Sequence, residues 1–194
     1  MLRRLIAIAL AVGGLIMTSG CEHSFARDAG FRTWQEEVRL NDGRVIVVAQ
    51  KRRCEGAYTG QNLASCIERE SWVTIRLPEF GNQEIVWNEK LYPMVLNVHE
   101  GQLYVVGGFP TEGEFRLYGK PKPAYVGFRW ENGHWKRIAF TEIPKAIYDT
   151  NMVIDLPPKG TQLLALSQKE SRDMNANPEY PKQYKRIDPS YKID

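Results

Sequence analysis

The clearest signal in the first half of the chain is an alternation of apolar and polar positions. The segment TWQEEVRL places Trp34, Val38 and Leu40 on one face of a strand, with Glu36 among them. The segment SWVTIRLP alternates in the same way, with Val73 on its apolar face. A period of two residues indicates strands that bury one face.

Glycine turns separate these runs. Asn-Gly and Asp-Gly favour hairpins because glycine accepts a positive φ. The runs VIVVA and LYVV are apolar on both faces, which is typical of central strands. We expect about seven or eight strands and no long amphipathic helix in residues 32–140. The three turns are Asn41-Asp42-Gly43, His99-Glu100-Gly101 and Glu131-Asn132-Gly133.

The pattern changes after Phe140, where prolines break the sequence and no period is visible. Ser167 and Glu170 have the spacing of a capping box, which predicts a short helix near residues 168–175. The last residues are either disordered or a belt held on the domain by aromatic and aliphatic side chains. The candidates for holding it are Tyr180, Tyr184, Ile187 and Tyr191. The fold class is therefore mostly β: a single antiparallel meander, sandwich or open barrel-like domain with a short C-terminal helix and an extended tail.

The N-terminus has the organisation of a secretory signal peptide. Arg3 and Arg4 precede an uncharged apolar run, Leu5 to Met17, and the small residues Thr18-Ser19-Gly20 follow it. The run has 13 residues, whereas a helix that spans a bilayer needs about 20.

The motif Ser19-Gly20-Cys21 resembles the lipobox of bacterial lipoproteins, although Thr18 departs from the usual leucine. The resemblance implies that the Cys21 thiol receives a diacylglycerol and that the new amino terminus is acylated. Two or three acyl chains hold a protein stably on a membrane. Glu22 is not the aspartate associated with inner-membrane retention, so the resemblance favours the periplasmic face of the outer membrane within the cell envelope. The alternative is cleavage near Gly20 that leaves Cys21 as a free thiol.

These signals divide the chain into four segments. They are a signal peptide at 1–20, a lipid anchor and spacer at 21–31, a β-rich domain at 32–166, and a short helix with a tail at 167–194. The 174 residues after the signal peptide suit one domain. They carry 24 basic and 23 acidic side chains, a net charge of +1. This balance gives no electrostatic reason to expect a nucleic-acid partner.

Two cysteines remain after Cys21. An exported protein meets an oxidising compartment, so we expect Cys54 and Cys66 to form a disulfide. Their spacing matches no zinc pattern, and no nearby histidine completes one.

The segments WQEEVRLNDGRVIVV, PAYVGFRW and WKRI resemble those of β-rich proteins and lipoproteins of Gram-negative bacteria. The resemblance implies a bacterial source and no mechanism.

Candidate chemistry is sparse. His99 and His134 flank predicted turns, where they are either a metal or acid–base pair or two polar turn residues in water. No metal site and no cofactor are predicted, because no ligand spacing supports one. Glu36-Glu37 is one of many acidic pairs that could serve glycoside hydrolysis.

The strongest candidate for a binding face is the predicted hairpin around residues 125–140. Tyr125, Arg129, Trp130 and Trp135 combine aromatic and cationic side chains, which dominate interface energetics. The alternative is that its aromatics form a core face, since strands are rich in aromatics.

The sequence therefore favours an envelope-anchored lipoprotein with a binding or structural role. Its partners would be the membrane, through the anchor, and an envelope protein or peptidoglycan. The alternatives are a periplasmic enzyme acting on cell-envelope glycans and a phage- or plasmid-borne surface protein that blocks uptake.

Overall fold

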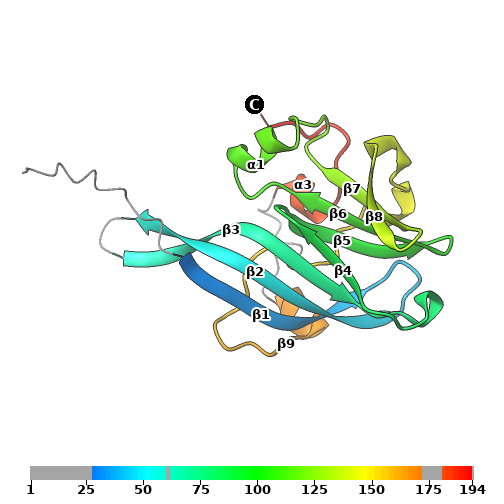
Figure 1. Cartoon of the computed structure of the whole chain (residues 1–194), viewed down its shortest axis with the longest axis horizontal. Helices are drawn as coiled ribbons and strands as arrows, with labels where there is room; N and C mark the ends of the chain where they lie inside the picture. The colour runs from blue at the N-terminus through cyan, green and yellow to red at the C-terminus, as the bar shows by residue number, and fades with distance from the viewer. Residues whose placement is uncertain (1–27, 60–61, 172–180, 194) are drawn as a thin grey trace, which may run out of the picture.

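The computed structural model describes residues 28–59, 62–171 and 181–193. It is mostly β, as predicted, and is built from two sheets that do not close into a barrel within these residues (Figure 1). The larger sheet has the strand order β4-β3-β2-β1-β9. Its strands are β1 (Asp28–Arg39), β2 (Val45–Thr59), β3 (Asn62–Ile75), β4 (Ile85–Glu89) and β9 (Leu163–Leu164).

The second sheet is an antiparallel meander in the order β5-β6-β7-β8. Its turns follow the predicted glycines. Glu100 and Gly101 have φ angles of 48° and 74°, and Asn132 and Gly133 have 49° and 81°, the backbone that two-residue hairpins require. The strands are β5 (Tyr92–His99), β6 (Gln102–Gly108), β7 (Val126–Glu131) and β8 (His134–Ile138).

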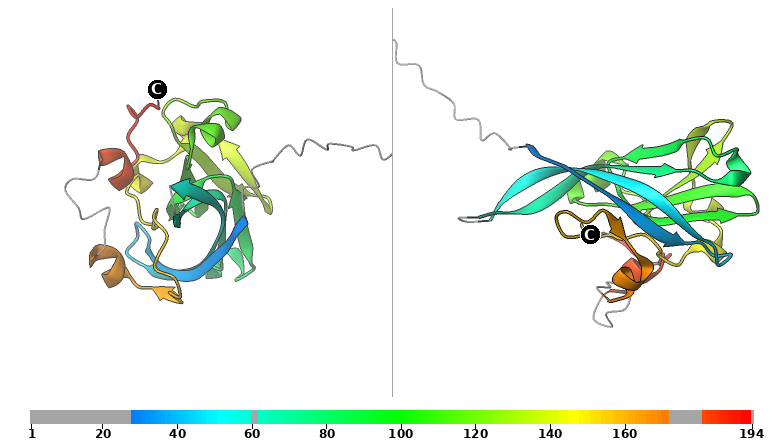
Figure 2. Two further views of the ribbon diagram at one scale, coloured as in Figure 1. Left: turned by 90° about the vertical axis from the view of Figure 1, so that its left-hand side faces the viewer. Right: turned by 90° about the horizontal axis from the view of Figure 1, so that it is seen from below.

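The inner faces of the two sheets enclose the main core. The alternation in β1 is confirmed, because Trp34, Val38 and Leu40 are buried and Glu36 is buried among them. The larger sheet curves around this core (Figure 2). Trp87 from β4 meets Phe128 from β7 edge to face, with ring centroids 5.7 Å apart. Apolar side chains from both sheets therefore exclude water from one shared layer.

The structure differs from the strand predictions in three details. Strand β6 is central and buried on both faces, as expected. Strand β2 is also central, but Val45 and Val47 on its outer face are exposed. Strand β9 runs parallel to β1, which makes the larger sheet mixed rather than purely antiparallel. Strand β1 begins at Asp28, four residues before the predicted start of the domain.

The helices are short. They are α1 (Glu112–Leu117), α2 (Leu166–Ser171) and α3 (Lys182–Lys185), with the 3₁₀ turns η1 (Pro78–Phe80), η2 (Phe140–Glu142) and η3 (Lys145–Ile147). The predicted short C-terminal helix corresponds to α2, which begins two residues earlier, at Leu166. At its start the Gln168 side chain accepts a bond from the Ala165 amide at 3.0 Å. Residues 172–180, including Tyr180, lie outside the described residues.

Residues 181–193 form a belt on the domain, which is one of the two alternatives that the sequence allows for the tail. They lie against the face of the four-stranded sheet that points away from the larger sheet. Ile187 is 1% exposed there, beside Ile147 and Tyr148. The Ala124 amide donates to the Tyr191 carbonyl at 3.1 Å. The chain end therefore covers a second apolar layer, which would otherwise face water.

The predicted disulfide between Cys54 and Cys66 is present. It links β2 to β3 where these strands pair directly, with Gly56 opposite Cys66 and Cys54 opposite Glu68. The bond therefore clasps a hairpin that extends beyond the four-stranded sheet (Figure 1), rather than an irregular surface loop.

We expect Cys54→Ser to lower the free energy of unfolding by about 3 kcal/mol. The bond closes a loop of 13 residues, and the loss of this constraint increases the entropy of the unfolded chain. Urea unfolding of the variant, compared with Cys54→Ser/Cys66→Ser, measures the effect without a free thiol. An unfolding midpoint equal to that of the parent would contradict a stabilising bond.

Candidate functional site

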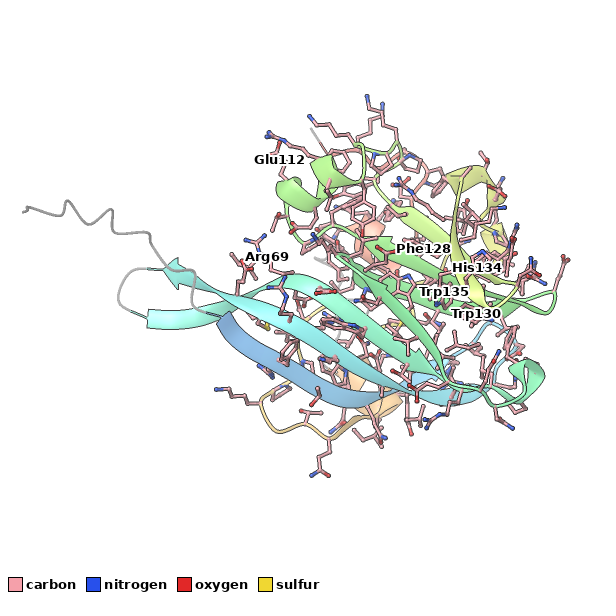
Figure 3. All side chains as sticks on the ribbon, viewed as in Figure 1. Arg69, Glu112, Phe128, Trp130, His134 and Trp135 are labelled. Atoms are coloured by element: carbon pink, nitrogen blue, oxygen red, sulfur yellow. A yellow bond between two sulfur atoms is a disulfide. The ribbon has the colours of Figure 1, made fainter. Side chains whose placement is uncertain are left out.

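Two residues of the predicted binding face lie together. Trp130 and Trp135 are cross-strand partners in β7 and β8, with ring centroids 5.4 Å apart. Both are half-buried and pack against the main core beside Phe128 (Figure 3). The Trp135 indole nitrogen also donates to the Val86 carbonyl of β4 at 2.9 Å. This pair therefore closes the gap between the edges of the two sheets.

The other two residues of that prediction lie on the opposite face of the four-stranded sheet. Tyr125 is 3% exposed; its hydroxyl donates to the Gln183 carbonyl at 3.1 Å and accepts from the Asp188 amide at 3.3 Å. Burial raises the pKa of this phenol above its usual range. Arg129 pairs with Glu131. The four residues therefore do not share one surface.

The two histidines do not form a pair. His99 ends β5 and His134 begins β8, the two outer strands of the sheet. Three strand spacings, about 14 Å, separate the two histidines, so their side chains cannot bind one ligand together. Among the described residues, no group of three or more histidine, cysteine or acidic side chains is arranged to hold a metal ion.

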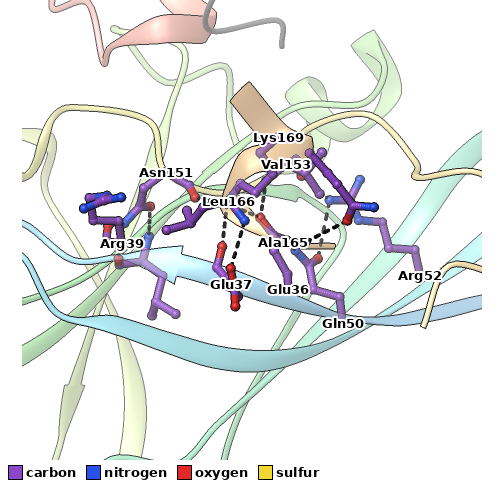
Figure 4. Close-up of polar contacts among 12 residues, drawn as sticks. Glu36, Glu37, Arg39, Gln50, Arg52, Asn151, Val153, Ala165, Leu166 and Lys169 are labelled. Carbon is purple, nitrogen blue, oxygen red and sulfur yellow. Dashed lines mark hydrogen bonds and ion pairs between the residues drawn. The ribbon is translucent and has the colours of Figure 1, made fainter. Parts of the chain in front are cut away.

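Glu36 and Glu37 point to opposite faces of β1, so they do not form the facing carboxylates of a glycosidase. Glu37 accepts a bond from the Leu166 amide at 2.9 Å. Glu36 is completely buried. Its carboxylate pairs with Lys169 of α2 at 2.7 Å and accepts from the Val153 amide at 2.7 Å (Figure 4). Glu36 is thus paired with other groups of the same domain, and its role is structural.

Arg52 extends the buried network along the inner face of β2. Its guanidinium pairs with Glu68 at 2.5 Å and donates to the carbonyls of Val153 and Ile154, both at 2.6 Å. Gln50 bridges it to Glu36 (Figure 4). Only the Nε atom of this guanidinium lacks a partner within the described part of the chain. The network binds the segment before β9 to the concave face of the larger sheet.

The exposed large apolar side chains concentrate on the outer face of the larger sheet. Six large apolar side chains are exposed among the described residues, and five of them lie on this face. The outer face of an antiparallel sheet is ordinarily polar, and clustered exposed apolar side chains mark interaction sites. The five are Phe31, Val45, Val47, Val86 and Leu163; the sixth, Leu117, is on α1.

The end of this face at which β1 begins carries a cluster of Phe31, Lys51 and Trp72, called the proximal cluster below. Phe31 is 52% exposed and meets Trp72 edge to face at 6.0 Å. The Lys51 ammonium lies 4.2 Å from the centre of the Phe31 ring and 4.6 Å from that of Trp72. No carboxylate in the described residues forms an ion pair with Lys51. It therefore presents one positive charge between two aromatic rings.

The far end of the same face carries two exposed valines of β2, Val45 and Val47. The exposed Val86 of β4 lies nearer the middle of the face, opposite Thr74, and its carbonyl accepts a hydrogen bond from the half-buried Trp135. We call these four residues the distal patch. Between the two ends lies an open hollow of about 580 Å³. Its outward-facing side chains are Thr33, Gln35, Ala49, Lys51 and Thr74. Apolar and polar groups thus occur in succession along one face.

Sequence reasoning missed this face for identifiable reasons. The run VIVVA predicts a strand buried on both sides, and Trp72 occupies the polar side of the alternating segment SWVTIRLP. The alternation itself carried the signal. Because Val48 and Gln50 of β2 face inward, the residues next to them along the strand had to face outward.

A scan against protein-family models finds none that matches the chain, and searches of curated proteins and of solved structures find no similar protein. Within the described residues, no helix has both the length and the apolar character needed to cross a membrane.

We expect Glu36→Ala to lower the free energy of unfolding by about 3–5 kcal/mol, because it leaves the Lys169 ammonium buried without its partner. The matched control is Glu84→Ala, which breaks the exposed pair with Arg76 and should cost less than about 1 kcal/mol. Urea unfolding measures both. Equal losses would show that the buried pair has no special role, and Glu36→Met/Lys169→Met should recover much of the loss.

Proposed function

We propose that this chain is an envelope lipoprotein, anchored through Cys21, whose β domain binds a partner protein through the outer face of its larger sheet. The apolar run and the Ser19-Gly20-Cys21 motif support export and acylation. The Cys54–Cys66 bond supports an oxidising compartment, where such bonds persist.

The observation that carries the binding role is the concentration of five of six exposed large apolar side chains on one face. Each of them costs free energy in water that contact with an apolar surface would recover. Scattered single apolar residues would need no explanation, but a shared face does.

Within that face, the distal patch suits a protein partner best. Val45, Val47 and Val86 supply apolar area, and Trp135 supplies an aromatic side chain of the kind that dominates interface energies. The Arg76–Glu84 ion pair lies beside the valines at the surface, with both side chains more than half exposed. An apolar centre with a charged border is the usual organisation of a protein interface.

The anchor is tested by the intact mass of the protein purified from membranes of a Gram-negative host. We expect a chain that begins at Cys21 and carries the added mass of acyl chains. Cys21→Ser is the control and should lack both the lipid mass and the cleavage. An unmodified chain cut near Gly20 would contradict the anchor.

The binding face is tested by a photoreactive phenylalanine analogue placed at Val47 in living cells. We expect a discrete cross-linked product that contains one envelope protein, because Val47 lies in the distal patch. The matched control is the same analogue at Leu117, which is 63% exposed but on α1, and should give no such product. Identical products at both positions, or none at Val47, would contradict the proposal.

A further inference from the structure

The proximal cluster has a different chemistry from the distal patch. It combines a half-exposed phenylalanine, a half-buried tryptophan and a lysine without a carboxylate partner in the described residues. Aromatic rings and lysine are the side chains that proteins place at the level of lipid headgroups. The lysine stem can lie along apolar surface while its ammonium reaches a phosphate.

The charges around the cluster leave Lys51 uncompensated. Arg53 pairs with Glu55 at 3.2 Å and with Glu70 at 3.6 Å. Arg69 pairs with Glu55 at 2.7 Å. The neighbouring acids therefore have cationic partners of their own, and the cluster presents a net positive charge. A positive charge is complementary to an anionic lipid surface.

The length of chain before β1 places this cluster near the proposed anchor. Phe31 follows Cys21 by ten residues, and an extended chain of that length reaches at most about 35 Å. Lys51 and Trp72 lie beside it across the register of the sheet, since Lys51 is opposite both Thr33 and Trp72. Phe31 is opposite Arg53 of β2. Measured along β2 from Arg53, Val45 and Val47 of the distal patch are about 26 and 20 Å away, and Val86, which is level with Ala49, is about 13 Å away.

We infer that the proximal cluster docks on the headgroup region of the bilayer leaflet that holds the anchor, with Phe31 and Trp72 inserted and Lys51 on an anionic phosphate. This inference rests on the proposed acylation of Cys21 and deepens the proposed function. The acyl chains hold the domain near the surface, and the cluster orients it there. The distal patch is then held away from the bilayer, where a partner protein can reach it.

The experiment uses the acylated chain, purified from membranes and reconstituted into vesicles of phosphatidylethanolamine and phosphatidylglycerol. A small fraction of the phosphatidylethanolamine carries a diazirine on its headgroup. After illumination, mass spectrometry maps the lipid adducts on the protein. We expect adducts at Phe31 and Trp72 in at least about tenfold excess over Val47, because burial of one aromatic side chain shifts an equilibrium by that factor or more.

Matched variants separate docking from mere proximity. Phe31→Ser and Lys51→Glu should each reduce labelling of the cluster, Phe31→Ser by about tenfold. Val47→Ser should leave it unchanged, although Val47 is as exposed as Phe31, at 51% against 52%. Vesicles of a neutral phosphatidylcholine should reduce labelling if Lys51 contacts anionic lipid. Far-ultraviolet circular dichroism confirms that each variant is folded.

Two results would overturn the inference. Equal labelling of Phe31 and Val47, or labelling that is insensitive to Phe31→Ser, would each do so. The intact mass of the same sample separates this failure from that of the anchor. An acylated chain without adducts at Phe31 contradicts only the docking, whereas a chain without acyl mass contradicts the proposed function.

Discussion

The buried ion pair between Glu36 and Lys169 is the interaction on which the arrangement of the domain depends. It joins the first strand to the last described segment before residue 172, two parts of the chain separated by 133 positions. Two charges removed from water are costly unless each is paired and hydrogen bonded. Here the Val153 amide and the Asn151 carbonyl complete the set at 2.7 and 2.5 Å, so the pair specifies one position for the C-terminal segment.

This closure determines which surfaces remain available. Arg52 and Glu36 fix residues 150–156 against the concave face of the larger sheet, and the tail covers the far face of the smaller one. The side chain of Asn151 also makes the hydrogen bonds that a neighbouring strand would make to β5, because it bonds both the amide and the carbonyl of Leu96. Of the four sheet faces, the convex face of the larger sheet is thus the one without a covering segment in the described residues.

The sequence predicted the local features well and the long-range ones poorly. Alternation marked the buried face of β1 because a strand has a strict period of two, and the same pattern showed Glu36 among apolar neighbours. The sequence does not predict the partner of Glu36, because Lys169 follows it by 133 residues and the pairing depends on tertiary packing. The burial of Tyr125 was missed for the same reason: its cover comes from residues 183–188, whose position no local pattern contains.

The disulfide gives the curved sheet a mechanical role in addition to its effect on stability. Cys54 and Cys66 clasp β2 to β3 near the end where β1 begins, so the two strands are held together at that end of the sheet. A strand pair without this clasp can twist and fray. Under the proposed docking, an orientation set at Phe31 would extend along the β1–β2 pair to the turn at Gly43, at its other end. The proposed anchor at Cys21 and this clasped pair would then together favour one orientation of the domain at a membrane.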